Sequence, residues 1–272
     1  MFTYSRIRSA ALGAIALAFL AVSATSLASH SWGNYHWARK TDPFTLKLGD
    51  NLTSANWKAH LATTSQEWNS GNTPLQTSIV AGQARKRCSM VLGTTQVCNG
   101  RYGNNGWLGL ASINITGGTH ITQGTAKVND TYFDTPTYNT PEERLHVMCQ
   151  EVAHTFGLGH TSEDGTSQKT CMDYSSDPDS TGPNQHDFDQ LESIYTHTDN
   201  TTTVAARTAL AASTSDVTDD PISWGHRIRQ SRNGRHSHYE RLNGDGSKTL
   251  THVYWTREAA ANCPSCDHRY DR

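Results

Sequence analysis

The sequence lacks several features that would assign it to a common class. It contains neither a G-x-S-x-G nucleophile elbow nor a G-x-x-x-x-G-K phosphate loop, so serine-elbow and P-loop chemistry have no motif here. It also lacks a surplus of positive charge, because 23 Lys and Arg stand against 25 Asp and Glu. That balance excludes a bulk nucleic-acid binder. Charged residues make up 18% of the chain and hydrophobic residues 35%, which predicts one folded main domain with a sizeable core.

Long hydrophobic runs are missing everywhere except near the N-terminus. There, Arg6 and Arg8 precede the uncharged run "ALGAIALAFLAV", and small residues follow up to Ala28. This pattern predicts a secretory signal peptide, residues 1–28, cleaved after Ala28. An uncleaved membrane anchor is the alternative, although the run is shorter than the ~20 residues that a spanning helix needs. We therefore expect a secreted, extracellular monomer with no membrane span after cleavage.

Cysteine is scarce but even in number, with six residues. In an oxidising compartment such a set predicts disulfide bonds. Proximity in the sequence favours three pairs: Cys88 with Cys98, Cys149 with Cys171, and Cys263 with Cys266. The last pair forms a "CPSC" motif that is also compatible with a redox or metal site, but a metal site would need a second cysteine pair.

The C-terminal region differs from the rest of the chain in composition. Residues 198–220 are rich in Thr, Ser and Ala and predict a flexible linker, and residues 221–272 carry nine Lys and Arg against five Asp and Glu. Alternating runs around "NGDGS" predict a small β-rich tail with hairpin turns. Its dispersed histidines favour a basic surface for an anionic cell-surface or glycan partner over a second metal site. They are His226, His236, His238, His252 and His268.

The remaining 29–197 region predicts alternating strands and helices. Alternation in "FTLKLGD" indicates a strand, and Ser54 then caps a helix with apolar residues at helical spacing. Three more strand-like runs follow: "PLQTSIVAG", "GWLGLASINI" and "THITQGTAKVN". Thr140 as N-cap, Pro141 and Glu143 mark the start of a second helix that runs toward Gly157. A last helix is expected at about 184–197.

The second helix contains the residues that carry chemistry. Side chains four residues apart lie one turn apart on one face, so Gln150 and His154 can converge on one metal ion. Glu151, beside the first ligand position, is placed to accept a proton from water. Gly157 ends the helix and lets the chain turn back, so that His160 supplies a third ligand. This spacing suits a catalytic zinc ion.

The stretch "QEVAHTFGLGH" resembles the zinc motif of the metzincin metallopeptidases, and the surrounding order is similar to that of matrixins. The resemblance covers about residues 32–197 and implies an α+β fold: a twisted mixed β-sheet, an active-site helix and a closing C-terminal helix. It implies Zn²⁺ as cofactor, a polypeptide substrate and endopeptidase activity. Met172 would form the methionine turn below the metal, and Tyr174 would be an oxyanion donor or an extra ligand. Leu110 and Ala111 would lie on the edge strand that pairs with extended substrate.

Gln150 is the departure from that motif, which has histidine at this position. A glutamine oxygen is a weaker zinc donor than imidazole, and its NH₂ group must be held elsewhere. His146 cannot replace it, since it lies two helical turns from His154, and we expect a supporting or solvent-facing role. Two hypotheses therefore stay open: a zinc endopeptidase, or a metzincin-fold binding module in which Gln150 has weakened or abolished zinc binding.

Overall fold

A computed structural model describes Met1 and residues 30–84, 87–162, 164–175, 177–206 and 218–262. The predicted signal peptide, the Cys263–Cys266 pair and half of the predicted linker lie outside these residues. Every helix in the described part of the chain is too short or too polar to traverse a bilayer.

The fold is built on one mixed β-sheet of nine strands, which confirms the predicted α+β class. Its strand order is β3-β2-β4-β6-β5-β9-β8-β7, and β1 pairs with β6 beside this path. Pairing is parallel from β3 to β6 and antiparallel from β6 through β5 to β7. The strands are β1 (His36–Trp37), β2 (Phe44–Asp50), β3 (Leu75–Ala81), β4 (Thr94–Gly100), β5 (Trp107–Thr116), β6 (His120–Asn129), β7 (His226–Gln230), β8 (His236–Leu242) and β9 (Lys248–Trp255).

Three helices begin at the positions that the sequence predicts. Ser54 caps α1 (Ala55–Trp68), Thr140 caps α3 (Pro141–His154), and Asn184 caps α4 (Gln185–Ile194), each by accepting a backbone N–H. The two long helices, α1 and α3, contact each other, and α3 lies on β5 and β6. Shorter helices are α2 (Asp130–Phe133), the 3₁₀ helix η1 (Pro221–Trp224) and α5 (Arg257–Asn262).

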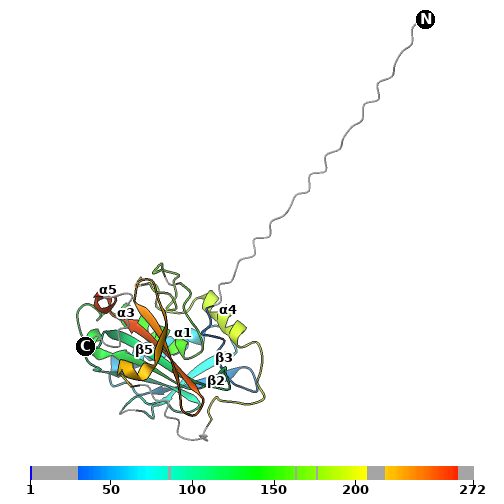
Figure 1. Ribbon diagram of the computed structural model, residues 1–272, viewed down its shortest axis with the longest axis horizontal. Coiled ribbons are helices and arrows are strands. Elements are labelled where there is room, and N and C mark those ends of the chain that lie inside the picture. The colour runs from blue at the N-terminus through cyan, green and yellow to red at the C-terminus, as the bar shows by residue number, and fades with distance from the viewer. Residues whose placement is uncertain (2–29, 85–86, 163, 176, 207–217, 263–272) are drawn as a thin grey trace.

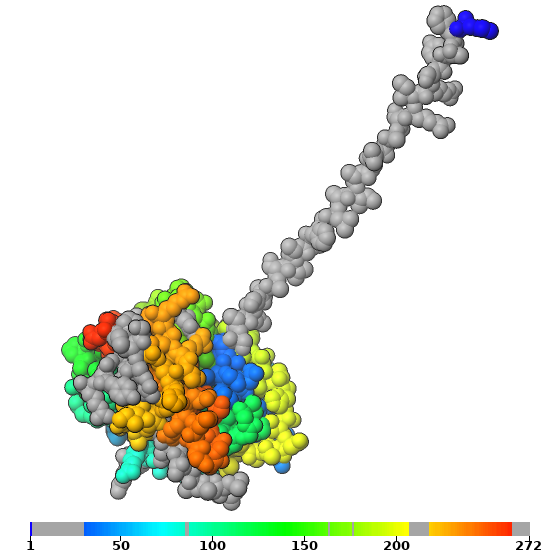
Figure 2. Space-filling model, in the orientation of Figure 1, coloured from blue at the N-terminus to red at the C-terminus, as the bar shows by residue number. Residues whose placement is uncertain are grey.

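The C-terminal strands join the main sheet instead of forming a region apart. We expected residues 221–272 to be a small separate tail, but β9 pairs with β5 from Ile115 back to Trp107. Figure 1 shows the orange and red strands of the β8–β9 hairpin running beside β5. In the space-filling view these residues form the middle of the visible face (Figure 2). The hairpin is therefore part of the main sheet, and β9 contacts α3.

Alternation along β9 explains why the hairpin stays in place. Leu250 and Tyr254 point into the large core that contains α1 and α3. Val253 and Trp255 point to the other face, where a second core forms with Trp107, Leu110, Trp224 and Tyr239. Each fully buried side chain of this size contributes about 1.5–3 kcal/mol. Both faces of β9 are thus covered, as in a central strand of a sheet.

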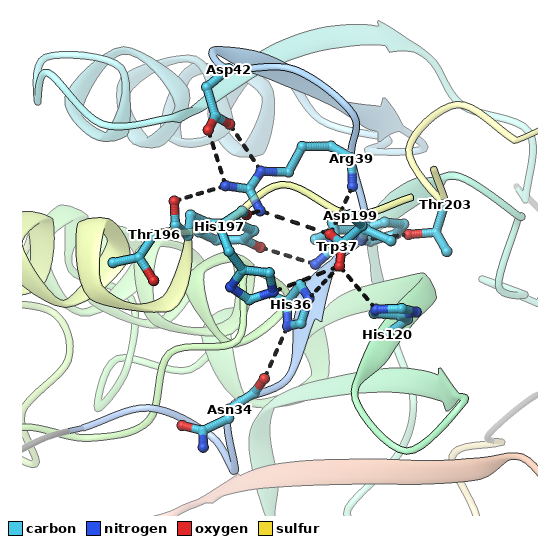
Figure 3. A network of polar contacts seen from close by, with 12 residues as sticks. Asn34, His36, Trp37, Arg39, Asp42, His120, Thr196, His197, Asp199 and Thr203 are labelled. Carbon is cyan, nitrogen blue, oxygen red and sulfur yellow. Dashed lines mark hydrogen bonds and ion pairs between the residues drawn. The ribbon is translucent and has the colours of Figure 1, made fainter. Parts of the chain in front are cut away.

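A polar network fixes the short strand β1 to the segment after α4 (Figure 3). The Oδ1 atom of Asp199 lies 3.4 Å from Nε2 of His36 and 3.2 Å from Nε2 of His120. Its Oδ2 atom accepts the backbone N–H of Arg39. Although burial opposes ionisation, these contacts outweigh it and lower the pKa of Asp199. One carboxylate thereby holds three separate segments together.

Candidate active site

The site begins on the last turns of α3, where Gln150, Glu151 and His154 are all fully buried. Gln150 and His154 are one turn apart, as predicted. The amide of Gln150 is anchored, because its Nε2 donates to the carbonyl oxygens of Cys171 at 2.7 Å and Asp173 at 3.0 Å. Its Oε1 atom is buried and has no hydrogen-bond partner. A buried oxygen without a partner is costly, and a cation beside it would satisfy it.

His154 and His160 form the second part of the site. Their Nε2 atoms lie 3.1 Å apart. Nδ1 of His154 lies 2.9 Å from the carbonyl oxygen of Leu158, and since a carbonyl only accepts, Nδ1 carries the proton and Nε2 keeps its lone pair. Two nitrogens bound to one tetrahedral zinc ion at about 2.05 Å are roughly 3.3 Å apart. The donor set therefore fits zinc.

Gly157 makes the turn that returns His160 to the helix. Its φ angle is +97°, a region that favours glycine. A Cβ atom there would lie 2.0 Å from the carbonyl oxygen of Tyr35, so no other residue fits without a backbone shift. α3 already ends at His154, with Thr155 as its C-cap, so Gly157 redirects the chain three residues after the helix and does not end it.

The floor of the site is tied to α3 by a disulfide bond. The predicted pairs Cys149–Cys171 and Cys88–Cys98 are both confirmed. Met172 follows Cys171 and is fully buried, and its carbonyl oxygen accepts the backbone N–H of Thr161. This contact holds the segment after His160 against the predicted methionine turn.

Tyr174 lies beside His160, one of the predicted metal ligands. Its hydroxyl oxygen is 2.8 Å from Nδ1 of His160. Its ring stacks on His236 with centroids 3.8 Å apart. In this arrangement Tyr174 orients the His160 ring. The oxyanion and extra-ligand roles expected from the resemblance stay predictions.

His146 supports the site from the preceding turn of α3. It is buried, its Nδ1 contacts the Ser180 carbonyl oxygen, and its Nε2 lies 3.5 Å from Nε2 of Gln150. The sequence left open a supporting role or a solvent-facing position for His146. The structure agrees with the supporting role, and the solvent-facing position is wrong.

Three tail histidines complete a cluster that the sequence did not predict. We interpreted them as part of a basic surface, but His236 and His252 are fully buried and His238 is 5% exposed. His252 pairs across the hairpin with His238, and strand alternation places His236 on the same face. Their rings contact those of His154 and His160. The H-x-H spacing in "HSH" was the signal available in the sequence.

His252 approaches both the predicted base and the predicted ligands. Its Nδ1 lies 2.9 Å from Oε2 of Glu151, and its Nε2 lies 3.0 Å from Nδ1 of His236. One nitrogen from each of His154, His160 and His252 falls within 4.8 Å of the others. Among the described residues, this group is one of three that could hold a metal ion by that measure.

Burial sets the protonation of these groups. Desolvation lowers the pKa of His154 and of His252 to about 3, so both imidazoles are neutral near pH 7, as metal ligands must be. Desolvation also raises the pKa of Glu151 to about 8, against the opposing effect of His154. A bound cation would favour the ionised carboxylate.

The predicted substrate edge at Leu110 and Ala111 is wrong for the described structure. Leu110 pairs with Val253 and Ala111 with His252, so β5 is an interior strand. The hydrophobic face of β9 explains this pairing, because Val253 and Trp255 are buried only when β9 lies against β5. No extended peptide can add to β5 while β9 is there.

No family model matches the chain, and no curated protein sequence is similar to it. Among solved structures, the chain is similar to high choriolytic enzyme 1, a hatching enzyme zinc-protease from the medaka fish Oryzias latipes. The sequence identity is 11%, the match covers 59% of this chain and 94% of the other, and the TM-score is 0.34. Similarity at this level carries no weight for function.

Proposed function

We propose that this chain is a secreted, zinc-dependent endopeptidase that acts on extended polypeptides. The observation that carries the proposal is the pair of Nε2 atoms of His154 and His160, which lie 3.1 Å apart. Glu151, whose carboxyl group interacts with His154, lies on α3 together with His154. Gln150 Oε1 is the proposed third donor, since its NH₂ group is already anchored. The resemblance of "QEVAHTFGLGH" to a metallopeptidase motif supports the same assignment.

The protein residues would perform distinct steps. Gln150, His154 and His160 would hold the zinc ion, which when bound would supply Lewis acidity to water and to the scissile carbonyl group. Glu151 accepts a proton from the attacking water and transfers it to the leaving amine. Tyr174 holds the His160 ring through Nδ1. The buried, water-poor surroundings strengthen each of these polar interactions.

A second candidate is a metal-binding module without catalysis. It is favoured by the burial of Glu151, whose Oε2 contacts His252, and by the pairing of β5 with β9. For either candidate, an anionic partner of the basic tail stays a proposal. Because three of the tail histidines are buried, the arginines of β7 are the proposed contact for that partner.

Cleavage of an unstructured polypeptide by the zinc-loaded chain tests the function. We expect slow cleavage by the wild type and faster cleavage by Trp255→Ala, which loosens β9 without touching the donors. Adding Glu151→Gln should abolish cleavage in both backgrounds while zinc content stays the same. Absence of cleavage by both folded, zinc-loaded parents would contradict the proposal, as would cleavage that survives Glu151→Gln.

A further inference from the structure

The β8–β9 hairpin meets the candidate metal site at two points. The first is the strand edge: β9 runs antiparallel to β5 and pairs Ala111 with His252. The second is the donor cluster, because the same His252 side chain lies beside Glu151 and within 4.8 Å of donor atoms on His154 and His160. One residue of the hairpin thus links strand pairing to the metal donors.

The contacts of His252 are those expected of a metal ligand. A histidine that binds a metal commonly donates its other ring N–H to a carboxylate, which fixes the ring and its tautomer. Nδ1 of His252 lies 2.9 Å from Oε2 of Glu151, and both side chains are fully buried. With Nδ1 donating to Glu151, the lone pair belongs to Nε2. Nε2 currently contacts His236, so metal binding exchanges that contact for a bond to the ion.

Counting donors shows what this would do to the site. Gln150, His154 and His160 are the three proposed donors, and His252 would be a fourth. Structural zinc sites have four protein ligands, whereas catalytic sites keep one position open for water. With His252 bound no position remains for water, and the Glu151 carboxylate is engaged by His252 and not by a reactant.

We infer that the β8–β9 hairpin is a built-in inhibitor of this chain, in which His252 is a ligand of the same zinc ion and β9 occupies the edge of β5 that an extended substrate needs. This inference rests on the proposed function. It explains why Gln150 can stand in place of a histidine: the closed site has a third imidazole, supplied from β9. Catalysis then requires β9 to leave β5, which removes both obstacles together.

The hairpin is held firmly enough for such a role. Tyr239, Val253 and Trp255 bury their side chains in the second core against Trp107 and Leu110. Trp255 Nε1 also donates to Ser237 across the hairpin at 2.9 Å. These contacts lie on the face of the sheet away from the donor cluster. A substitution at His252 therefore leaves the second-core contacts that hold the hairpin unchanged.

The test compares His252→Ala with the matched control His238→Ala in the full chain. Both substitutions remove a buried imidazole from one cross-strand pair, but His238 is not in the donor group. Competition titration with zinc should show at least a tenfold loss of affinity for His252→Ala and at most a twofold change for His238→Ala. Equal affinity of His252→Ala and wild type would overturn the inference.

A measurement on the wild-type protein does not depend on whether the variants fold. Zinc-edge X-ray absorption of the wild type should fit three imidazoles, and a fit to two with an added water would overturn the inference. The cleavage assay above reports on the proposed function separately. Three imidazoles without cleavage by Trp255→Ala would retain His252 as a ligand and contradict the peptidase. Two imidazoles with cleavage would retain the peptidase and contradict the inhibitor.

Discussion

Gln150 makes two donor contacts and still has an oxygen free for a metal ion, whereas a histidine that bound the ion could make only one donor contact. Its NH₂ group donates to the carbonyl oxygens of Cys171 and Asp173, and its Oε1 is left without a partner. The amide thus braces the segment before Tyr174 while it presents an oxygen to the site. An imidazole has one nitrogen for a ligand bond and one for a single donor contact.

Replacing Gln150 by histidine should strengthen zinc binding, because imidazole is the better donor for zinc. We expect tighter binding in a competition titration and a lower free energy of unfolding for the metal-free chain, since two hydrogen bonds to carbonyl oxygens are reduced to at most one. Gln150→Ala is the control and should weaken zinc binding. Affinity for Gln150→His that equals or falls below the wild-type value would count against Gln150 as a ligand.

The sequence predicts only those site residues that lie close together along the chain. Glu151, His154, Gly157 and His160 follow one helix and one turn, whose geometry is local. His252 is 101 positions from Glu151, and its role depends on which strand lies next to β5. Without that pairing, a histidine flanked by Thr251 and Val253 has no visible partner, so the interpretation as a surface residue was wrong.

Helices and strands show the same difference between features set by local sequence and features set by distant contacts. The caps at Ser54, Thr140 and Asn184 and the alternation in β2 mark helices and strands by local chemistry, and the structure has those elements. Strand order is not local. The tail was correctly expected to form strands, but the composition change at residues 198–220 suggested a boundary, whereas the burial of Val253 and Trp255 joins the tail to the sheet.

Asp199→Asn tests the network that ties β1 to the end of α4. The side chain is 8% exposed and close to three histidines, so loss of its charge should lower the free energy of unfolding by about 1–3 kcal/mol at neutral pH. Asp189→Asn, on the exposed face of α4, should change it by less than about 0.5 kcal/mol. Urea unfolding of both variants measures these effects.

The same substitution gives a pH dependence of known sign. The pKa of Asp199 is lowered in the folded state, so its stabilising effect is complete above the unfolded value of 3.8 and is lost as pH falls through the lower folded value. The difference between wild type and Asp199→Asn should therefore shrink as pH falls below 3.8. A difference that grows as pH falls below 4 would contradict the assigned pKa direction.

At the scale of the whole molecule, the C-terminal hairpin completes a sheet that begins near the N-terminus. Trp255→Ala should lower the free energy of unfolding by about 3–5 kcal/mol, because the indole ring is fully buried in the second core. Hydrogen exchange should accelerate in β8 and β9 and remain slow in β2 and β3. Leu242→Ala, at an exposed position on β8, is the control and should have almost no effect. Uniform acceleration over all strands would contradict an independently opening hairpin.

Anomalous diffraction at the zinc edge, from crystals of the full chain grown with saturating zinc, tests the central claim most directly. The account predicts one strong peak bounded by Oε1 of Gln150 and ring nitrogens of His154, His160 and His252, with β9 paired to β5. An absence of any peak between His154 and His160 under these conditions would contradict the metal site. A peak there with a water in place of His252 would contradict the inhibitory hairpin.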